Sequence, residues 1–126
     1  MKTKQKGNYY YTLVSKQALQ DMANSGISEQ DAEEFVNQFH DLGNYPDPCK
    51  CREIKPIARR DVPDNVIRFK PVYPYCLCRY RGIVVIFEYS DCDKKPVLAL
   101  AGVFVRDENT YDAALTNRLR KLGVMS

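Results

Sequence analysis

The chain has 126 residues, which is enough for one compact domain and too few for two. Hydrophobic residues make up 44% of it, and nine tyrosines and five phenylalanines can fill a core, so a disordered or fibrous chain is excluded. No apolar run approaches the roughly 18 residues of a membrane span, and residues 1–14 lack the apolar stretch of a signal peptide. We therefore expect a cytoplasmic protein with no membrane partner, in which most of the five cysteines are thiols.

The net charge of +3 is unevenly distributed along the chain. Residues 1–49 carry a net charge of −3, whereas residues 50–81 carry nine basic and three acidic groups, and residues 82–126 are neutral overall. A basic middle third is typical of a protein that binds a polyanion, either a nucleic acid or an acidic protein segment. The alternative is a solvated basic surface without a partner.

The first part of the chain predicts a strand and two helices. Residues 1–8 are polar and are expected to form a flexible lead-in to a single domain over residues 9–126. Residues 9–14 (YYYTLV) are β-prone. Ser15 and Ser28 are suitable N-caps for two helices whose apolar residues recur at helical spacing, ending at residues 24–26 and at Gly43. We expect these helices to form an antiparallel hairpin on a sheet.

The second part of the chain is rich in predicted strands. Residues 43–65 carry four prolines and predict a long irregular connection. Four strands are then expected, at residues 66–72, 76–80, 83–90 and 97–105, the last two as central strands buried on both faces. Residues 91–96 predict the turn between them, and residues 107–123 predict a final helix. The expected fold is α+β, with a helical hairpin packed on a mostly antiparallel, twisted sheet of about four strands and a C-terminal helix.

Catalytic candidates of the common kinds are few. The one histidine, His40, lies beside core positions of the second helix and is expected to be structural rather than functional. Cys49 and Cys51, like Cys76 and Cys78, have one residue between them, whereas structural zinc sites use two to four. We expect buried thiols there and no metal or cofactor. A zinc-bound or redox module built on these four cysteines is the alternative.

A set of basic residues and one tyrosine, carried by the later strands and the final helix, is the remaining candidate site. Arg68 and Lys70 alternate onto one face of their strand. Converging guanidinium and ammonium groups bind a phosphate and stabilise charge that grows on it in a transition state. A tyrosine at the rim can stack on a base or relay a proton. The alternative is a set of surface arginines with a core tyrosine. The members are Arg68, Lys70, Arg79, Arg81, Arg106 and Tyr111.

Five segments occur in an order found in one known family. They are YYYTLVSKQALQDM (9–22), NYPDP (44–48), VIRFK (66–70), RYRGIVVIFEYSD (79–91) and VLALAGVFVRDENTYDAALTNRLRKL (97–122). Together they resemble, from about Tyr9 to Leu122, the RelE/ParE superfamily of bacterial type II toxins, including its HigB-like branch. The matching features are an opening strand and helical hairpin, a strand with alternating basic residues, and a final hairpin followed by a helix.

The resemblance implies the toxin of a type II toxin–antitoxin system, a metal-independent endoribonuclease that cuts ribosome-bound mRNA. In such enzymes the 2′-OH of the RNA attacks the adjacent phosphate, and the protein supplies a base, a cationic clamp and an acid for the leaving group. No cofactor is needed. The implied partners are mRNA on the ribosome and a cognate antitoxin, in the cytoplasm.

The resemblance also implies roles for single positions. Arg68 and Lys70 would orient or deprotonate the nucleophile and bind phosphate, and either Arg79 or Arg81 would be the arginine of the next strand. Arg106 would stabilise the phosphorane, and Tyr111 would stack on the substrate or transfer a proton. The implied catalytic set is Arg68, Lys70, Arg81, Arg106 and Tyr111, and the implied RNA-binding set is Lys50, Arg52, Lys55, Arg59, Arg60 and Arg79.

Two departures from the family pattern favour a second interpretation. Arg68 stands where a lysine is common, and an arginine is a poor general base because its pKa stays above about 12. No histidine occurs near the C-terminus. Both features favour a non-enzymatic binder on the same fold, either a gyrase poison or a module that binds a nucleic acid or another protein.

Overall fold

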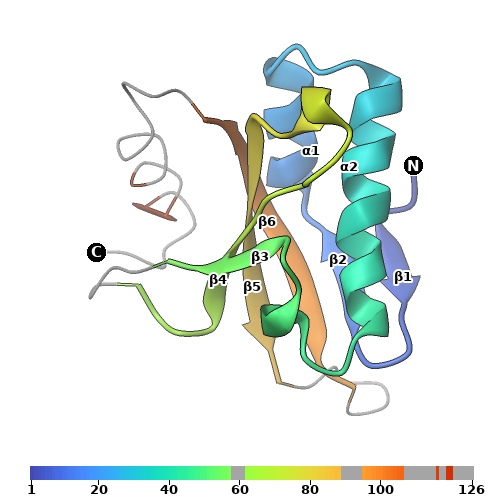
Figure 1. Cartoon of the computed structure of the whole chain (residues 1–126), viewed down its shortest axis with the longest axis vertical. Helices are drawn as coiled ribbons and strands as arrows, with labels where there is room; N and C mark the ends of the chain where they lie inside the picture. Colours follow the sequence, from blue (N-terminus) through green and yellow to red (C-terminus); the bar gives the residue numbers. More distant parts are fainter. Residues whose placement is uncertain (58–61, 89–94, 107–115, 117–118, 121–126) are drawn as a thin grey trace.

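The computed structural model describes residues 1–57, 62–88, 95–106, 116, 119 and 120. These residues form a mixed sheet with two helices on one of its faces (Figure 1). The strands are β1 (Lys4–Lys6), β2 (Tyr11–Val14), β3 (Ile54–Pro56), β4 (Val66–Phe69), β5 (Tyr80–Phe87) and β6 (Val97–Val105). The helices are α1 (Lys16–Asn24) and α2 (Glu29–Asp41), with short 3-10 helices η1 (Leu42–Asn44), η2 (Pro48–Lys50) and η3 (Tyr75–Leu77).

The strands are arranged in the order β1-β2-β6-β5-β4-β3. The β2–β6 pair is parallel, and each of the other neighbouring pairs is antiparallel. The α+β class is therefore confirmed, whereas the sheet is mixed because of the parallel β2–β6 pair. The expectation of about four strands is wrong for the described chain, because three-residue strands extend both edges of the sheet. Edge strands of this length need no run of buried side chains, so hydrophobic alternation does not indicate them.

Two predicted segments differ from the structure. Part of the expected lead-in forms β1, in which Lys4 pairs with Leu13 and Lys6 pairs with Tyr11. The strand expected at residues 76–80 is wrong, because Cys76 and Leu77 belong to η3, residues 78–79 form a turn and β5 begins only at Tyr80. Pro74 precedes η3, and its carbonyl accepts the N–H of Leu77 at 2.9 Å. Local turn bonds thus replace the ladder bonds that a strand would make there.

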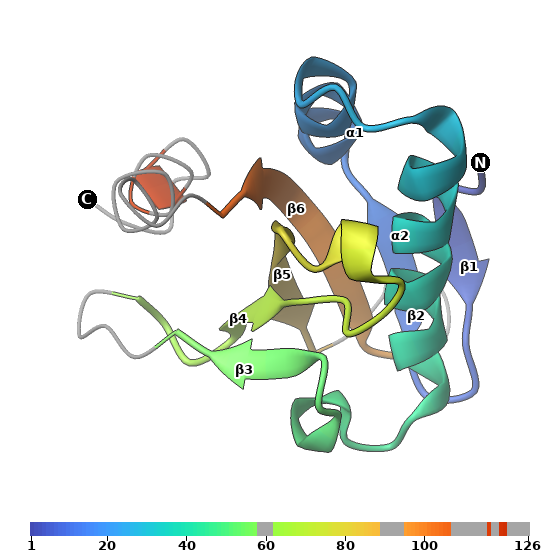
Figure 2. The same cartoon turned by 45° about the horizontal axis from the view of Figure 1, so that its top comes forward.

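The two helices begin where the sequence predicts, because each has a serine N-cap. The Oγ atoms of Ser15 and Ser28 accept the N–H groups of Ala18 and Asp31, at 3.0 and 3.1 Å. Gly26 lies between the helices with a φ of +78°, a left-handed conformation that glycine adopts without steric cost. Both helices pack on the same face of the sheet, as Figure 2 shows, which confirms the helical layer.

The sheet is buried on both faces. On the helix side, the rings of Phe35 and Phe39 pack edge-on against Phe69, with centroids 5.1 and 6.3 Å apart. On the opposite side, Ile83 and Phe104 belong to a second apolar cluster. The near-continuous apolar sequences of β5 and β6 follow from this burial on both faces.

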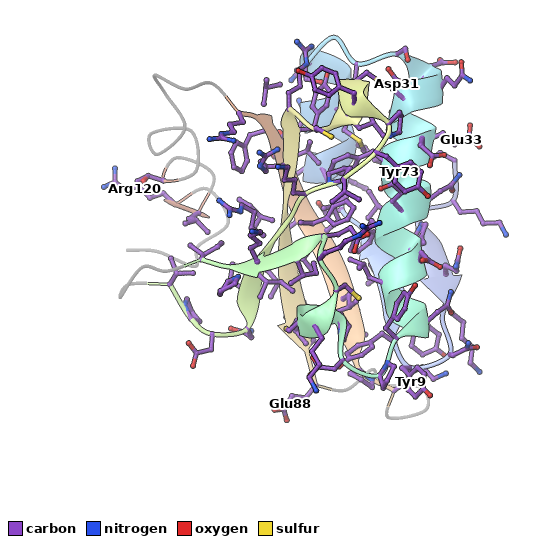
Figure 3. The ribbon with its side chains drawn as sticks, in the orientation of Figure 1. Tyr9, Asp31, Glu33, Tyr73, Glu88 and Arg120 are labelled. Atoms are coloured by element: carbon purple, nitrogen blue, oxygen red, sulfur yellow. The ribbon has the colours of Figure 1, made fainter. Side chains whose placement is uncertain are left out.

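The expected C-terminal helix falls largely outside the described residues. Thr116, Leu119 and Arg120 are described, and all three are helical. Leu119 is fully buried in the second apolar cluster, so this segment covers the face opposite α1 and α2. Figure 3 shows Arg120 on that side of the sheet. Within the described residues, no helix is both long and apolar enough to cross a membrane.

α1 takes the place of a strand beside the second half of β6. Since β2 pairs with β6 only as far as Leu100, the edge of β6 beyond that point needs other partners. Ser15 supplies two, because its N–H donates to the carbonyl of Leu100 and its Oγ donates to that of Ala101. The buried carboxylate of Asp21 accepts the N–H of Val103 at 3.0 Å. These bonds fix the end of β6, which leads into Arg106.

His40 is a buried structural residue, in agreement with the sequence analysis. Its side chain is 1% exposed, and Nε2 donates to the carbonyl of Lys2 at 2.8 Å while Nδ1 bonds to the hydroxyl of Thr12. Burial lowers the pKa of His40, and the positive charge of Lys2 acts in the same direction, against the hydrogen bond to the Lys2 carbonyl, which raises it.

This lowered pKa predicts a loss of stability in mild acid. Below about pH 6.5 the unfolded chain binds a proton at His40 that the folded chain resists, so the free energy of unfolding falls as pH falls. Chemical denaturation at a series of pH values from neutral to mildly acid measures this slope. His40→Gln should be less stable at neutral pH but should flatten the slope. An unchanged slope in the variant would contradict the assignment.

Candidate functional site

Five basic side chains lie on one face of the sheet, the face opposite α1 and α2. Lys55 pairs with Arg68 across β3 and β4, and Arg68 pairs with Ile83, a member of the second apolar cluster. Because strand side chains alternate with period two, Arg81 shares the face of Ile83 and Lys70 shares that of Arg68. Phe104 pairs with Arg81, and Arg106 follows Phe104 by two residues. We call Lys55, Arg68, Lys70, Arg81 and Arg106 the basic cluster.

The basic cluster encloses a small pocket. All five of its members line this cavity of about 210 Å³. The structure thus brings together four residues of the predicted catalytic set, Arg68, Lys70, Arg81 and Arg106. The fifth, Tyr111, lies outside the described residues.

Arg81 is the most constrained member of the cluster. It is 3% exposed, and its Nη1 donates to the backbone carbonyls of Cys78 and Tyr80. Burial lowers the pKa of Arg81 to about 10, with the positive charges of Arg106 and Arg68 acting in the same direction. Burial and the charge of Arg106 likewise lower the pKa of Arg68. The three guanidinium groups therefore repel one another, and an anion placed among them would relieve that repulsion.

Of Arg79 and Arg81, the geometry favours Arg81 as the arginine of the candidate site. Arg79 does not line the small pocket. Its guanidinium carbon lies 5.1 Å from the ring centroid of Tyr80, and its Nη2 donates to the Tyr80 hydroxyl at 3.1 Å. This hydrogen bond raises the pKa of Arg79. Arg81 is thus a buried guanidinium group that lines the small pocket. Arg79 is an exposed planar group outside it.

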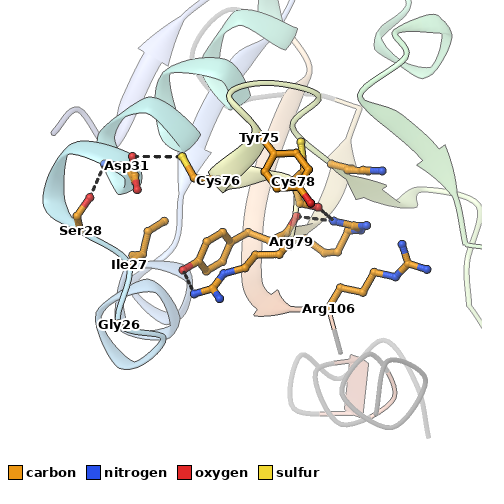
Figure 4. Close-up of a pocket in the computed structure, with 12 residues that line it drawn as sticks. Gly26, Ile27, Ser28, Asp31, Tyr75, Cys76, Cys78, Arg79 and Arg106 are labelled. Carbon is orange, nitrogen blue, oxygen red and sulfur yellow. Dashed lines mark hydrogen bonds between the residues drawn. The ribbon is translucent and has the colours of Figure 1, made fainter. Parts of the chain in front are cut away.

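A larger groove of about 870 Å³ continues from the cluster (Figure 4). Lys70, Arg81 and Arg106 belong to both cavities. From them the groove extends past Tyr75 on η3 to the turn between α1 and α2, where Ile27 lines it. We call this cavity the groove.

Most of the other residues predicted to bind RNA lie away from the cluster or outside the described chain. Lys50 and Arg52 are exposed, lie 4.0 and 3.9 Å from the carboxylates of Asp47 and Glu53, and line neither cavity. Arg59 and Arg60 lie outside the described residues. Lys55 does reach the cluster, because β3 pairs it with Arg68. No sequence signal indicates this place for Lys55, since β3 has no apolar alternation.

The expectation of buried thiols is wrong for the four described cysteines. Cys49 and Cys76 are exposed, and Cys51 and Cys78 are half-buried; Cys49 belongs to the short helix η2, and Cys76 belongs to η3, which replaces part of the expected strand. All four are thiols. Across the described ranges of the chain, no three His, Cys, Asp or Glu side chains are grouped so that they could hold a metal ion.

Comparison with known proteins finds no matching family model, no similar curated protein and no similar solved structure.

The cluster predicts that a small anion stabilises the folded protein. Millimolar inorganic phosphate should raise the melting temperature by a few degrees above that in chloride of equal ionic strength, because the ligand binds only the folded state. Thermal denaturation measures the shift. Arg106→Gln and Lys70→Gln should reduce the shift, whereas Lys50→Gln, which changes an exposed lysine outside the cluster, should retain it. A full shift in Arg106→Gln would place the phosphate elsewhere.

Proposed function

We propose that the protein is a RelE-like toxin of a type II toxin–antitoxin system, a metal-independent endoribonuclease that cuts mRNA on the ribosome. The observation that carries this proposal is the convergence of Arg68, Lys70, Arg81 and Arg106 on one pocket. The proposed partners are the mRNA and a cognate antitoxin, in the cytoplasm.

The chemistry of the basic cluster suits phosphoryl transfer within RNA. Attack of the 2′-OH on the adjacent phosphate builds negative charge on the phosphorane oxygens as the 5′ oxygen leaves. Arginine matches a phosphate with paired N–H groups, and donors held in place by the protein lose little energy in reorganisation. Arg81 is held in this way by two backbone carbonyls before any substrate arrives. Arg81 is repelled by Arg68 and Arg106 in the free protein, and negative charge that develops on the phosphorane would offset this repulsion.

The order of elements supports a RelE-like fold as part of the proposal. β2, α1, α2, β4, β5 and β6 follow the order of strand, helical hairpin, basic strand and final hairpin that the resemblance implies. In the structure, the basic strand β4 and the end of β6 meet at the cluster through β5. The segments that carry the resemblance thus supply four of the five cations of the cluster, and Lys55 comes from β3, outside those segments.

The resemblance implies that Arg68 or Lys70 orients or deprotonates the nucleophile and that Tyr111 stacks on the substrate or transfers a proton. The described members of the cluster are arginines and lysines, and Arg81 with a pKa of about 10 stays protonated at neutral pH. They therefore bind and stabilise an anion rather than remove a proton. This composition favours one second candidate, a non-enzymatic binder that uses the same cluster on nucleic acid or on gyrase.

Controlled expression in a bacterium, with mapping of transcript 5′ ends, tests the proposal. The wild type should arrest growth and produce new ends within translated regions. Arg106→Ala should reduce cleavage about 100-fold or more, as expected for loss of a group that stabilises transition-state charge. Lys16→Ala, which changes an exposed lysine of α1 that lines neither cavity, is the matched control and should cleave as the wild type does. Thermal denaturation of each purified protein verifies folding.

The other outcomes separate the two candidates. Arrest without new 5′ ends would support the non-enzymatic binder. Cleavage by folded Arg106→Ala at the wild-type rate would contradict the site. Cleavage by the purified protein that needs a divalent cation, and is lost in chelator, would contradict the metal-independent mechanism.

A further inference from the structure

Tyr75 is exposed far beyond what folding requires. Its side chain is 93% exposed, the highest value among the large hydrophobic residues in the described part of the chain. An aromatic ring in water contributes no burial energy to the fold. Its position at the groove, next to a cationic cluster, therefore points to a ligand.

The backbone below Tyr75 is firmly anchored. Leu77, two residues later in η3, is fully buried in the main core. The N–H of Cys78 donates to the carbonyl of Tyr75 at 3.0 Å, and Gln38 of α2 donates to the carbonyl of Tyr73 at 2.6 Å. The Tyr75 ring is thus presented by a fixed turn, which reduces the entropy lost when a ligand stacks on it.

Arg79 provides a second planar group in the same groove. Its guanidinium is held beside the Tyr80 ring by the hydrogen bond to the Tyr80 hydroxyl. Tyr80 itself is buried, so this support is rigid, while Arg79 is exposed. Figure 4 shows Tyr75 of η3, Arg79 just before β5 and Arg106 after β6 around the pocket. Aromatic rings and guanidinium planes are the groups on which proteins stack unpaired RNA bases.

The two cavities differ in size in a way that fits one nucleotide and its phosphate. The described residues that line the small pocket of about 210 Å³ are all cationic. The groove of about 870 Å³ is lined by apolar and polar groups as well, and it lies within the size range of small-molecule sites. Lys70, Arg81 and Arg106 join them, so a phosphate in the cluster would direct its nucleoside into the groove.

Building on the proposed ribonuclease function, we propose that the groove is a nucleobase-binding subsite for single-stranded RNA, with Tyr75 and Arg79 as its stacking residues. A base in a duplex is already stacked on its neighbours and cannot enter. The subsite therefore restricts the substrate to unpaired RNA next to the bound phosphate.

Fluorescence anisotropy with a labelled oligouridine tests the subsite. The RNA carries 2′-O-methyl groups, so that it cannot be cut. Tyr75→Ala should weaken binding about tenfold through lost stacking, and Tyr75→Phe should retain binding because it keeps the ring. Tyr9→Ala is the matched control, since Tyr9 is 48% exposed but lies at the opposite end of the molecule from Asp31 of the groove (Figure 3). Its affinity should equal that of the wild type.

Salt dependence separates stacking from charge. Tyr75→Ala should leave the slope of log affinity against log salt unchanged, whereas Arg106→Gln should reduce it by about 1. Unchanged affinity in Tyr75→Ala, with a reduced slope in Arg106→Gln, would overturn the subsite and leave the proposed function standing. Equal affinity for the matching duplex would also overturn the subsite. No binding of RNA by the wild type would overturn both.

Cys76 offers a second readout that needs no substitution. It is an exposed thiol that lines the groove, whereas Cys49 is an exposed thiol outside it. The oligouridine should slow alkylation of Cys76 and leave that of Cys49 unchanged, as measured for each peptide by mass spectrometry. Equal rates at Cys76 with and without bound RNA would overturn the proposed location.

Discussion

Repulsion among three guanidinium groups is the constraint around which this structure is organised. Arg68, Arg81 and Arg106 share one sheet face; the charge of Arg106 lowers the pKa of both Arg68 and Arg81, and the charge of Arg68 lowers that of Arg81. Left in water they would separate, so the fold must hold them. Register does this for Arg68 and Arg81, which lie on neighbouring strands whose apolar residues are buried on both faces. Folding thus bears an electrostatic cost that a phosphate bound at the cluster would reduce.

α1 contributes to the cluster from the other face of the sheet. Ser15 and Asp21 bind the backbone of β6 where β2 has ended, so that α1 serves as the missing neighbour of the strand. The end of β6 is also joined to β5, since the N–H of Arg106 donates to the carbonyl of Arg79 at 2.7 Å. The position of Arg106 therefore depends on contacts made on the helix side of the sheet. Rigid elements of this kind are suited to a site that must not relax when unoccupied.

Period-two alternation was sufficient to predict part of the site. It places Arg68 and Lys70 on one face of their strand. The long apolar runs predict β5 and β6, the strands that carry Arg81 and lead into Arg106. The serine N-caps likewise predict both helices. The membership of Lys55 in the cluster could not be predicted, since Lys55 lies on a three-residue strand with no apolar pattern. Tyr75 was missed because five alternating residues resemble a strand, whereas local turn bonds after Pro74 form η3.

The short outer strands have a consequence for self-association. An exposed sheet edge can pair with the edge of another molecule, and long apolar edges aggregate in this way. Here β1 is Lys-Gln-Lys and β3 ends in Pro56, which has no N–H to donate. In the described sheet, the long apolar strands β5 and β6 are interior, and α1 covers the part of β6 that β2 leaves open. The short edge strands β1 and β3, which have no apolar pattern in the sequence, thus disfavour edge-to-edge pairing between copies of the protein at high concentration.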